Sequence, residues 1–465
     1  MSNLLNDLVA VVGPEGVLRG EDVLQRSEDW FTGAPCRAKA IVRPRSTEQL
    51  SKVMAMCHQA DQPVVTHGGM TGIVHGGVAA PEELVVSLEL MNRIEEVDAV
   101  GSTMQVQAGV TLQRVQEAAE EIDMQFPLDL GARGSCTIGG NIATNAGGIR
   151  VIRYGMMRQQ VLGLEAVLSD GTVVSSMNKM LKNNAGYDLK QLFIGSEGTL
   201  GIVTRAVLRL QPYMPSEQTA LVAVPTFEAL TGLLGFASRE LANSLSAFEA
   251  LWNNHYRLMT TESGKYSPLL ADDSPFYAII ETLGLDEQPD AEHFSQVLEK
   301  ALEGGLITDA VLANSRAQRQ AIWGMREDIE VLVKELKPMF SYDVSMPIVH
   351  METYVEALEK NINAKWSQMG RVIVFGHLGD GNLHIMITVR DESPQSRRQV
   401  EEMVYTPLKE YGGSISAEHG VGLEKRDYLS ISRTNEEVSL MKRMKVALDP
   451  KCLLNRGKVV MLDCK

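Results

Sequence analysis

The segment GARGSCTIGGNIATNAGG, residues 131–148, alternates glycines with small polar side chains. Two further glycine-rich segments, HGGMTG at 67–72 and GSEGTLG at 195–201, lie in the same half of the chain. Backbone N–H groups can approach a pyrophosphate closely only where side chains are absent. One such loop alone is equally well explained by a tight turn. Three of them together predict a site for a large dinucleotide that lies extended across the surface.

The pattern around these loops is not that of the commonest nucleotide-binding folds. Neither of the first two loops matches GxGxxG at a strand-to-helix turn, which argues against a Rossmann site, and no Walker-type Gly-Lys-Ser segment occurs. Short β-branched runs alternate with helical stretches from about 38 to 210. TMQVQAG (103–109) predicts a strand, TLQRVQEAAEEIDMQF (111–126) a helix that begins at Thr111, and VLGLEAVLSDGTVV (161–174) a hairpin through Asp170 and Gly171.

The second half of the chain has a different organisation. Long amphipathic helices (227–244 and 347–368) alternate with apolar strands (276–284, 371–379 and 383–389). This pattern predicts helices layered on an antiparallel sheet. We therefore expect an α+β protein with an N-terminal helical segment (1–37), a nucleotide-binding domain (38–212), a cap domain (213–421) and a C-terminal segment (422–465).

Composition limits the possible partners and location. A net charge of -15 argues against a nucleic-acid partner, because phosphates would repel such a surface. The odd number and wide scatter of the cysteines exclude a disulfide framework and a thiolate zinc cluster and fit a reducing compartment. The first residues lack a basic region and a cleavage site, so we expect a cytoplasmic protein, with docking on a membrane surface left open. The cysteines are Cys36, Cys57, Cys136, Cys452 and Cys464.

Six motifs occur in the order seen in one enzyme family. They are PVVTHGGMTG (63–72), PLDLGARGSCTIGGNIATNAGG (127–148), GYDLKQLFIGSEGTLGI (186–202), HLGDGNLH (377–384), ISAEHGVGLEKRDYL (415–429) and LDPKCLLNRGK (448–458). Through them the chain resembles the FAD-dependent 2-hydroxy-acid dehydrogenases of the vanillyl-alcohol oxidase/p-cresol methylhydroxylase (PCMH) superfamily. That group includes D-lactate dehydrogenases, the glycolate oxidase flavin subunit and D-2-hydroxyglutarate dehydrogenase. The resemblance covers roughly residues 38 to 460.

The resemblance implies a PCMH-type FAD-binding domain made of two α+β subdomains, an antiparallel-sheet cap domain, and a C-terminus that returns to the FAD domain. Met70 stands where some superfamily members carry a flavin-linking histidine, so we expect the FAD to be bound non-covalently. The residues implied as FAD contacts are His67, Gly68, Gly69, Met70, Thr71, Gly72, Pro127, Leu130, Gly131, Ser135, Ile138, Gly139, Gly140, Asn141, Thr144, Asn145, Gly147, Glu197, Gly198, Gly201, Ile202 and Asn455.

Two histidines bracket the Asp380–Gly381 dipeptide in HLGDGNLH. If this dipeptide forms a two-residue hairpin turn, His377 faces His384 and both imidazoles point to one side of the sheet. Glu418, in SAEHG, supplies a third ligand, and two imidazoles plus one carboxylate leave an open position on zinc. In the family these positions bind a divalent metal, often zinc, in several members. The alternative is a structural histidine pair that stabilises a loop.

Two further residues complete the predicted site. Adjacent side chains diverge, so His419 does not share the metal with Glu418, and a histidine, whose reference pKa is about 6.5, suits the role of general base. Arg326 matches the family position that grips the substrate carboxylate, although an ordinary helical ion pair with Glu330 would also explain it. The other histidines (His58, His75, His255, His293 and His350) have no partner pattern, and we interpret them as surface or core residues.

We expect oxidation of a D-2-hydroxy acid, with hydride transfer to the flavin and reoxidation by an electron-transfer flavoprotein, a quinone or a cytochrome. A homodimer is compatible with this function. Ser341 and Met386 stand where animal 2-hydroxyglutarate enzymes carry Lys and Asn for the distal carboxylate. Their presence favours a monocarboxylate such as D-lactate, or another way of holding the second carboxylate. An oxygen-using oxidase and a non-catalytic FAD-binding protein are the alternatives.

Overall fold

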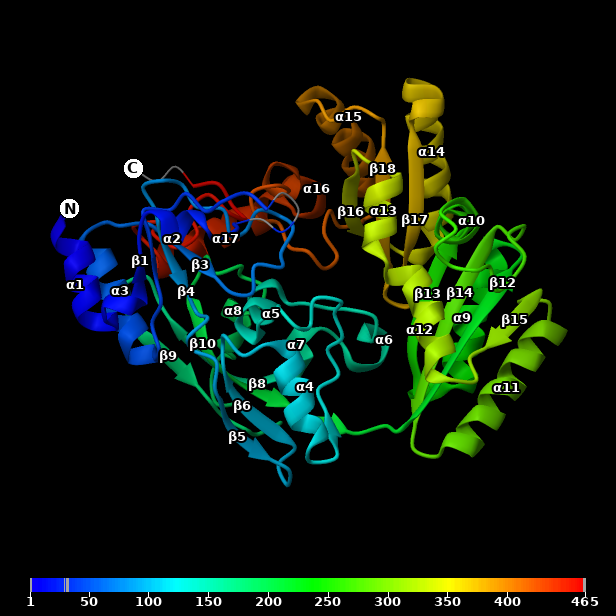
Figure 1. Cartoon of the computed structure of the whole chain (residues 1–465), viewed down its shortest axis with the longest axis horizontal. Helices are drawn as coiled ribbons and strands as arrows, with labels where there is room; N and C mark the ends of the chain where they lie inside the picture. The colour runs from blue at the N-terminus through cyan, green and yellow to red at the C-terminus, as the bar shows by residue number, and fades with distance from the viewer. Residues whose placement is uncertain (1, 29, 31–32, 463–465) are drawn as a thin grey trace. The chain divides into compact units, whose positions relative to one another are not determined.

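The computed structural model describes residues 2–28, 30 and 33–462. The chain forms two compact units, and each is described by itself (Figure 1). The first unit comprises Met1–Gly148, Gly155–Tyr213 and Glu418–Lys465, and the second comprises Ile149–Tyr154 and Met214–Ala417. The domain boundaries predicted from the sequence differ at two places, because they assign 149–154 to the nucleotide-binding domain and 418–421 to the cap domain.

A small mixed sheet opens the first unit. Its strand order is β1-β2-β4-β3, in which β2, β4 and β3 run parallel and β1 is antiparallel to β2. The helices α1 and α3 pack together, and Leu8, Leu50 and Met54 are fully buried in the core beneath them. Ser46 caps α3 by accepting from the Gln49 N–H. The elements are α1 (Ser2–Val12), β1 (Val17–Leu18), α2 (Glu21–Leu24), β2 (Ala40–Val42), α3 (Thr47–Gln59), β3 (Val64–His67) and β4 (Leu84–Ser87).

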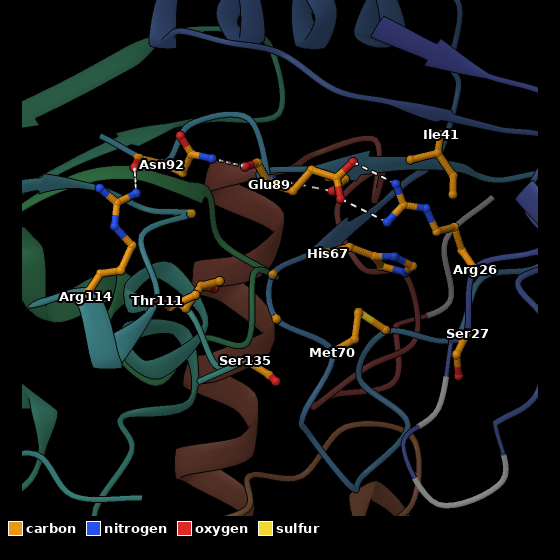
Figure 2. A pocket seen from close by; sticks show the side chains of 15 residues that line it. Arg26, Ser27, Ile41, His67, Met70, Glu89, Asn92, Thr111, Arg114 and Ser135 are labelled. Carbon is orange, nitrogen blue, oxygen red and sulfur yellow. Dashed lines mark hydrogen bonds and ion pairs between the residues drawn. The ribbon is translucent and has the colours of Figure 1, made fainter. Parts of the chain in front are cut away.

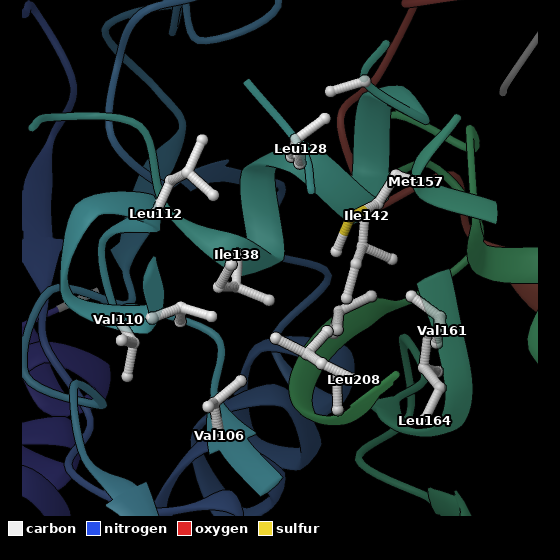
Figure 3. Close-up of a cluster of buried hydrophobic side chains, with 14 of the residues drawn as sticks. Val106, Val110, Leu112, Leu128, Ile138, Ile142, Met157, Val161, Leu164 and Leu208 are labelled. Atoms are coloured by element: carbon white, nitrogen blue, oxygen red, sulfur yellow. The ribbon is translucent and has the colours of Figure 1, made fainter. Parts of the chain in front are cut away.

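A five-stranded antiparallel sheet forms the rest of the first unit, in the order β5-β6-β10-β8-β9. Its apolar side packs against α4 and α5 (Figure 3). The predicted hairpin through Asp170 and Gly171 joins β8 to β9. The elements are β5 (Ile94–Asp98), β6 (Thr103–Gln107), α4 (Leu112–Glu120), β7 (Met124–Gln125), α5 (Ile138–Thr144), α7 (Met157–Gln160), β8 (Val161–Val167), β9 (Val173–Ser176), α8 (Lys190–Phe193), β10 (Ile202–Arg209) and β11 (Gln211–Pro212).

The C-terminal segment supplies α16 (Leu429–Ser432) and α17 (Asn435–Leu448) to the first unit and then lies beside β3, the edge strand of its small sheet. Leu454 bridges to Val64 at the start of β3. The buried Lys445 ammonium donates to the carbonyls of Thr199 and Leu454 and pairs with Asp449. The C-terminal segment is therefore part of the first unit.

The second unit contains one seven-stranded antiparallel sheet, in the order β15-β12-β14-β13-β17-β18-β16. Its strands are β12 (Ser216–Val224), β13 (Leu245–Trp252), β14 (Phe276–Gly284), β15 (Asp309–Leu312), β16 (Phe340–Ser345), β17 (Arg371–His377) and β18 (Asn382–Thr388). Eight of the nine residues of β14 are buried, as expected for a strand covered on both faces. The two faces carry different side chains, because residues alternate between them.

One face of this sheet packs against α9, α11, α14 and α15. Phe227 of α9 packs on Trp252 and Phe276, and Tyr405 of α15 packs on Tyr342. The other face, here called the histidine face, is covered by α10, the following π-helix η3, α12 and α13. The helices are α6 (Val151–Tyr154), α9 (Phe227–Glu240), α10 (Asn253–Arg257), η3 (Leu258–Glu262), α11 (Glu287–Glu303), α12 (Arg316–Glu327), α13 (Ile329–Glu335), α14 (Met351–Trp366) and α15 (Pro394–Tyr405).

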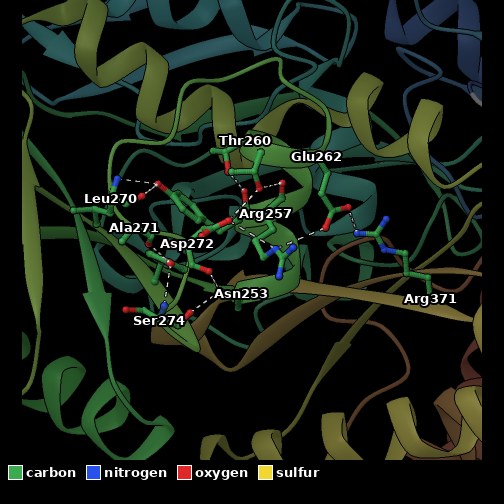
Figure 4. Close-up of polar contacts among 12 residues, drawn as sticks. Asn253, Arg257, Thr260, Glu262, Leu270, Ala271, Asp272, Ser274 and Arg371 are labelled. Carbon is green, nitrogen blue, oxygen red and sulfur yellow. Dashed lines mark hydrogen bonds and ion pairs between the residues drawn. The ribbon is translucent and has the colours of Figure 1, made fainter.

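Polar contacts hold α10 and η3 in place on the sheet (Figure 4). The Asn253 amide donates to the carbonyls of Asp272 and Ser274 at 2.8 and 2.7 Å. Arg371, at the start of β17, donates to Glu262 at 2.5 Å. These bonds fix the segment that covers the histidine face. The predicted α+β class, with two subdomains and an antiparallel cap sheet, is confirmed.

Residues 149–154 belong to the second unit because of their side-chain contacts. Arg150 pairs with the buried Glu281 at 3.1 Å and with Glu217 at 3.3 Å. Arg153 donates to the Leu283 carbonyl at 2.8 Å, and α6 packs on β13. Ile152 lies against Gly379, where a Cβ would come within 2.5 Å of its terminal carbon. A short piece of the N-terminal half thus supports the loop between His377 and His384.

Candidate active site

The glycine-rich loops of the first unit surround a cavity of about 370 Å³, here called the glycine-loop cavity. Residues of all three loops line it, together with Asn455, Glu418 and His419. Seventeen of the predicted FAD contacts line this cavity: Gly68, Gly69, Met70, Thr71, Gly72, Leu130, Gly131, Gly139, Gly140, Asn141, Thr144, Gly147, Glu197, Gly198, Gly201, Ile202 and Asn455.

A second cavity of about 480 Å³, here called the Arg26 cavity, shares Gly68, Gly69 and Met70 with the first. Figure 2 shows Arg26 and Arg114 among the residues that line it. The predicted contacts His67 and Ser135 line this cavity. Arg26 donates to both oxygens of Glu89 at 3.0 and 3.1 Å. Together the two cavities provide the extended space that a dinucleotide requires, and the sequence did not indicate Arg26, Glu89 or Arg114.

Three predicted contacts line neither cavity, as far as the described residues show. Ile138 is fully buried in the core of the larger sheet. Asn145 adopts a left-handed conformation at the end of α5, with φ +50, and its side-chain oxygen accepts from the Arg158 N–H at 2.9 Å. Pro127 is buried. Ile138 and Asn145 have packing and turn roles in this structure.

The cavity walls fit a bound cofactor that approaches the backbone closely. A Cβ at Gly69 would lie 2.1 Å from the Ser135 carbonyl oxygen, so this glycine lets the first two loops pack together. Gly72 and Gly131 are different, because a Cβ there would meet no protein atom within 4 Å and neither residue has a left-handed φ. Neither packing nor backbone conformation requires glycine at these two positions. The space beside both backbones is therefore open, and a bound ligand could approach them closely.

His419 lies on a loop that Glu197 holds in place. The buried Glu197 carboxylate accepts the N–H groups of Val421 at 2.7 Å and Gly422 at 2.8 Å. Burial raises the pKa of Glu197, which opposes ionisation even though these two N–H groups favour it. The Asn455 amide donates to the Glu197 carbonyl at 2.6 Å and its oxygen accepts from the Thr66 N–H at 2.9 Å. The cavity wall at His419 is therefore fixed by the loop 195–201 and the C-terminal segment.

His377 and His384 converge on the histidine face of the second unit. Their Nε2 atoms are 3.2 Å apart, and both side chains are nearly buried. Their convergence does not come from the predicted two-residue turn. His384 pairs with Phe375, His377 pairs with Glu249 of β13, and the connection consists of residues 378–381, in which only Gly381 is left-handed. Because Phe375 and His377 are two residues apart on one strand, the two imidazoles still reach the same face.

Glu249 is the functional candidate that the sequence did not reveal. It is fully buried on β13, where its Oε1 accepts from His377 Nδ1 at 2.6 Å and its Oε2 accepts from Arg326 Nε at 2.8 Å. Burial opposes ionisation of Glu249, but His377 and Arg326 outweigh that effect and lower its pKa to about 2. A signal was present in the sequence, because LSAFEALW places one carboxylate in an otherwise apolar strand.

Arg326 approaches the histidines from the end of α12. Its NH2 group lies 3.0 Å from His377 Nε2, and its guanidinium carbon lies 5.0 Å from the centre of the Phe375 ring. The ion pair that fixes this arginine is therefore with Glu249 and not with Glu330. His255 packs behind Phe375, with ring centres 4.5 Å apart, and burial lowers its pKa to about 3. His255 is a core residue, as predicted.

Glu418, the third predicted metal ligand, belongs to the first unit, where its carboxylate accepts the Gly148 N–H at 2.7 Å. The residue before it, Ala417, belongs to the second unit and donates its N–H to Asp343 at 2.9 Å. Asp343 is the strand partner of His384. The last residue of the second unit before Glu418 is therefore held beside the strand partner of His384.

Comparison with known proteins agrees with these features. Residues 38–176 match an FAD binding domain, and residues 214–459 match the C-terminal domain of FAD linked oxidases. A protein of Oryza sativa subsp. indica, named as a probable mitochondrial D-2-hydroxyglutarate dehydrogenase, is 39% identical over 97% of this chain and 80% of its own length. The chain belongs to the FAD-dependent D-2-hydroxy-acid dehydrogenase family.

Other members of the family show the same extent of similarity. The mitochondrial D-2-hydroxyglutarate dehydrogenase of Bos taurus is 37% identical over 98% of this chain and 83% of its own length. A Schizosaccharomyces pombe protein, provisionally named as a mitochondrial D-lactate dehydrogenase, is 36% identical over 93% of this chain and 84% of its own length. A crystal structure of p-cresol methylhydroxylase has the same fold, with a TM-score of 0.77 at 14% identity over 98% of this chain and 96% of that chain.

Family membership corrects the expected location. The rice, cattle and fission-yeast relatives are all named as mitochondrial, so the predicted cytoplasmic location is wrong. That prediction depended on the first residues of the chain and on cysteine scatter. The argument from the cysteines is also weak, because Cys452 takes part in a disulfide. Cys36, Cys57 and Cys136 are free and buried, and Cys464 lies outside the described residues. Among the described residues, no helix has both the length and the apolar composition needed to cross a bilayer.

Proposed function

We propose that this FAD-dependent enzyme oxidises a D-2-hydroxy acid to the 2-oxo acid with the help of a divalent metal, zinc by preference. The observation that carries the proposal is the convergence of His377 and His384, with Nε2 atoms 3.2 Å apart beside the Arg326 guanidinium. Two neutral imidazoles suit zinc, and a carboxylate from Glu418 would leave a position open for substrate. A bound metal would make the substrate hydroxyl more acidic.

In this proposal each side chain has a separate task. With a metal on His377 Nε2 in place of the Arg326 NH2 group, the outer nitrogens of Arg326 would bind the substrate carboxylate while its Nε stays on Glu249. His419 accepts the proton of the 2-hydroxyl group. FAD held by the glycine-rich loops would supply the acceptor for the Cα hydrogen as hydride, so the substrate would lose two electrons and two hydrogens in all. An electron-transfer flavoprotein, a quinone or a cytochrome then takes the electrons from the enzyme.

We infer that the substrate is a monocarboxylate such as D-lactate. Ser341 and Met386 are cross-strand partners on the histidine face, two residues along their strands from Asp343 and His384. A serine and a methionine supply no positive charge for a second carboxylate. The relatives are named as D-2-hydroxyglutarate and D-lactate dehydrogenases, and direct assay distinguishes the two substrates.

The deciding experiment is a panel of D- and L-2-hydroxy acids with an artificial electron acceptor, run after chelation and again with added zinc. We expect reduction of the acceptor by D-enantiomers, greater kcat/KM for D-lactate than for D-2-hydroxyglutarate, and restoration of activity by zinc. Equal activity before and after chelation, with no metal in the protein, would contradict the metal-dependent mechanism. Rapid peroxide formation in air without an acceptor would favour the oxidase alternative.

A further inference from the structure

We propose that Glu249 is a positioning residue that fixes the Nδ1–H tautomer of His377 and so keeps the Nε2 lone pair available as a ligand. The part that concerns metal binding rests on the proposed function above. The tautomer itself follows from geometry within the second unit and can be measured without any metal.

Glu249 contacts both functional groups with separate oxygens. Its Oε1 lies 2.6 Å from His377 Nδ1, and its Oε2 lies 2.8 Å from Arg326 Nε. The register places Glu249 directly opposite His377 on the neighbouring strand, so the carboxylate reaches the ring across one strand spacing. Glu249 is fully buried, and water does not compete for either contact.

Glu249 and Arg326 together determine which nitrogen of His377 carries the proton. Arg326 NH2 lies 3.0 Å from His377 Nε2, and a guanidinium can only donate hydrogen bonds. His377 Nε2 must therefore accept, which places the single proton of the neutral ring on Nδ1. That proton points at Glu249, an obligate acceptor when ionised. Carboxylates that accept from the far nitrogen of a metal-binding histidine orient the ring and increase its basicity.

This arrangement makes glutamine an informative substitution at position 249. A glutamine has one oxygen where the carboxylate has two. Arg326 Nε–H requires an acceptor, so it would take the amide oxygen and leave the amide NH2 facing His377 Nδ1. Each tautomer of His377 would then face one mismatched donor, the amide NH2 at Nδ1 or the Arg326 NH2 at Nε2, so the strict preference for Nδ1–H would be lost. An aspartate keeps two acceptor oxygens and should preserve the Nδ1–H form.

The experiment compares wild type, Glu249→Gln and Glu249→Asp, labelled with 15N-histidine, loaded with FAD and treated with chelator. The His377 signal is identified by its loss in His377→Gln, and its two nitrogen shifts report the tautomer. Glu281→Gln is the matched control, because Glu281 is also buried, lies on the same sheet and pairs with an arginine, Arg150, at 3.1 Å. Zinc affinity is measured on the same samples by competition with a chromogenic chelator.

We expect Nδ1–H in wild type, Glu249→Asp and Glu281→Gln, and a mixture of the Nδ1–H and Nε2–H forms in Glu249→Gln. Zinc affinity should fall about 10–100-fold in Glu249→Gln and stay within a few-fold in the control. An Nε2–H signal in the wild type would overturn the proposal even if the glutamine variant does not fold. Unchanged tautomer and zinc affinity in Glu249→Gln would also overturn it. If the tautomers are as expected but the wild type binds no zinc, the tautomer assignment stands and the proposed metal function falls.

Discussion

Ser341 on β16 and Met386 on β18 are directly opposed in the register of the seven-stranded sheet. Both positions lie on the histidine face, and Met386 is packed among the apolar residues that include Ile373 and Phe375. Two separate departures from the 2-hydroxyglutarate pattern thus meet at one place in the structure. A lysine and an asparagine at these positions would face the same space.

Substrate preference should respond to this pair. The double variant Ser341→Lys/Met386→Asn should raise kcat/KM for D-2-hydroxyglutarate relative to D-lactate by about 10–100-fold, because a hydrogen bond to a charged group contributes roughly 1.5–3 kcal/mol. Steady-state kinetics on both substrates measures the ratio, and each single variant serves as a control. An unchanged ratio in a variant with normal FAD content would show that the distal end of the substrate lies elsewhere.

Metal content should depend on the two histidines separately from flavin content. His377→Ala and His384→Ala each remove one of the two nitrogens that lie 3.2 Å apart, so each variant should lose most of its zinc by elemental analysis. FAD absorbance should persist, because the glycine-loop cavity is formed by residues of the first unit. His293→Ala is the control, since His293 is exposed. Full zinc occupancy in both histidine variants would contradict the metal site.

The proposed base can be tested by flavin reduction in a single turnover. His419→Ala should keep FAD and zinc but reduce the flavin about 10²–10⁴-fold more slowly, the usual loss for a general base. The loop should keep its position in the variant because Glu197 holds the backbone of Val421 and Gly422 and does not need the imidazole. Stopped-flow absorbance measures the rate. A rate within a few-fold of wild type would assign proton transfer to another group.

The flavin should leave the protein on acid precipitation. Met70 lines both cavities, and its thioether cannot form the histidyl bond that some superfamily members make to their flavin. Centrifugation after acid treatment should therefore leave all yellow colour in the supernatant. Flavin fluorescence retained in the washed pellet would show that a different residue forms a covalent link.

Acid stability should depend on His67. Burial lowers the pKa of His67 to about 4, although a hydrogen bond from its ring to the Gly77 carbonyl at 2.7 Å opposes that effect. Between pH 6.5 and 4 the unfolded chain binds a proton that the folded protein does not, so stability falls as the pH is lowered through this window. The difference approaches about 3 kcal/mol. Denaturant unfolding of wild type and His67→Gln from pH 7.5 to 4 should show a smaller loss in the variant, with His293→Gln resembling wild type.

Much of the fold was predictable because its signals are local. Residues close together in the sequence are enough to predict three elements. These are the hairpin through Asp170 and Gly171, the helix that begins at Thr111, and the two strands that carry His377 and His384. The glycine loops were predictable for the same reason. Their close approach to a ligand depends on glycine, which has no side chain, and glycines are identified directly in the sequence.

The parts that could not be predicted depend on pairing between distant segments. Glu249 acquires its role only because β13 lies beside β17, a neighbour 128 residues away in the chain. The predicted turn has two residues, but the observed connection has four, because the register pairs His384 with Phe375 and not with His377. An Asp-Gly dipeptide fits a two-residue turn and also a longer loop with glycine as its left-handed residue, and tertiary pairing decides between them.

The second unit consists of two separate segments of the chain, so it cannot be exchanged between relatives as one continuous piece. A fragment of residues 214–417 would contain every strand of the cap sheet but not Arg150, and Glu281 would then be buried without its cation, a strongly destabilising arrangement. It would also lack Ile152, which lies against Gly379 in the loop between the two histidines. Recombination that swaps cap domains between relatives must therefore carry this six-residue stretch along with the cap. Boundaries placed only at the ends of the matched domains would separate the seven-stranded sheet from Arg150 and Ile152, which support it.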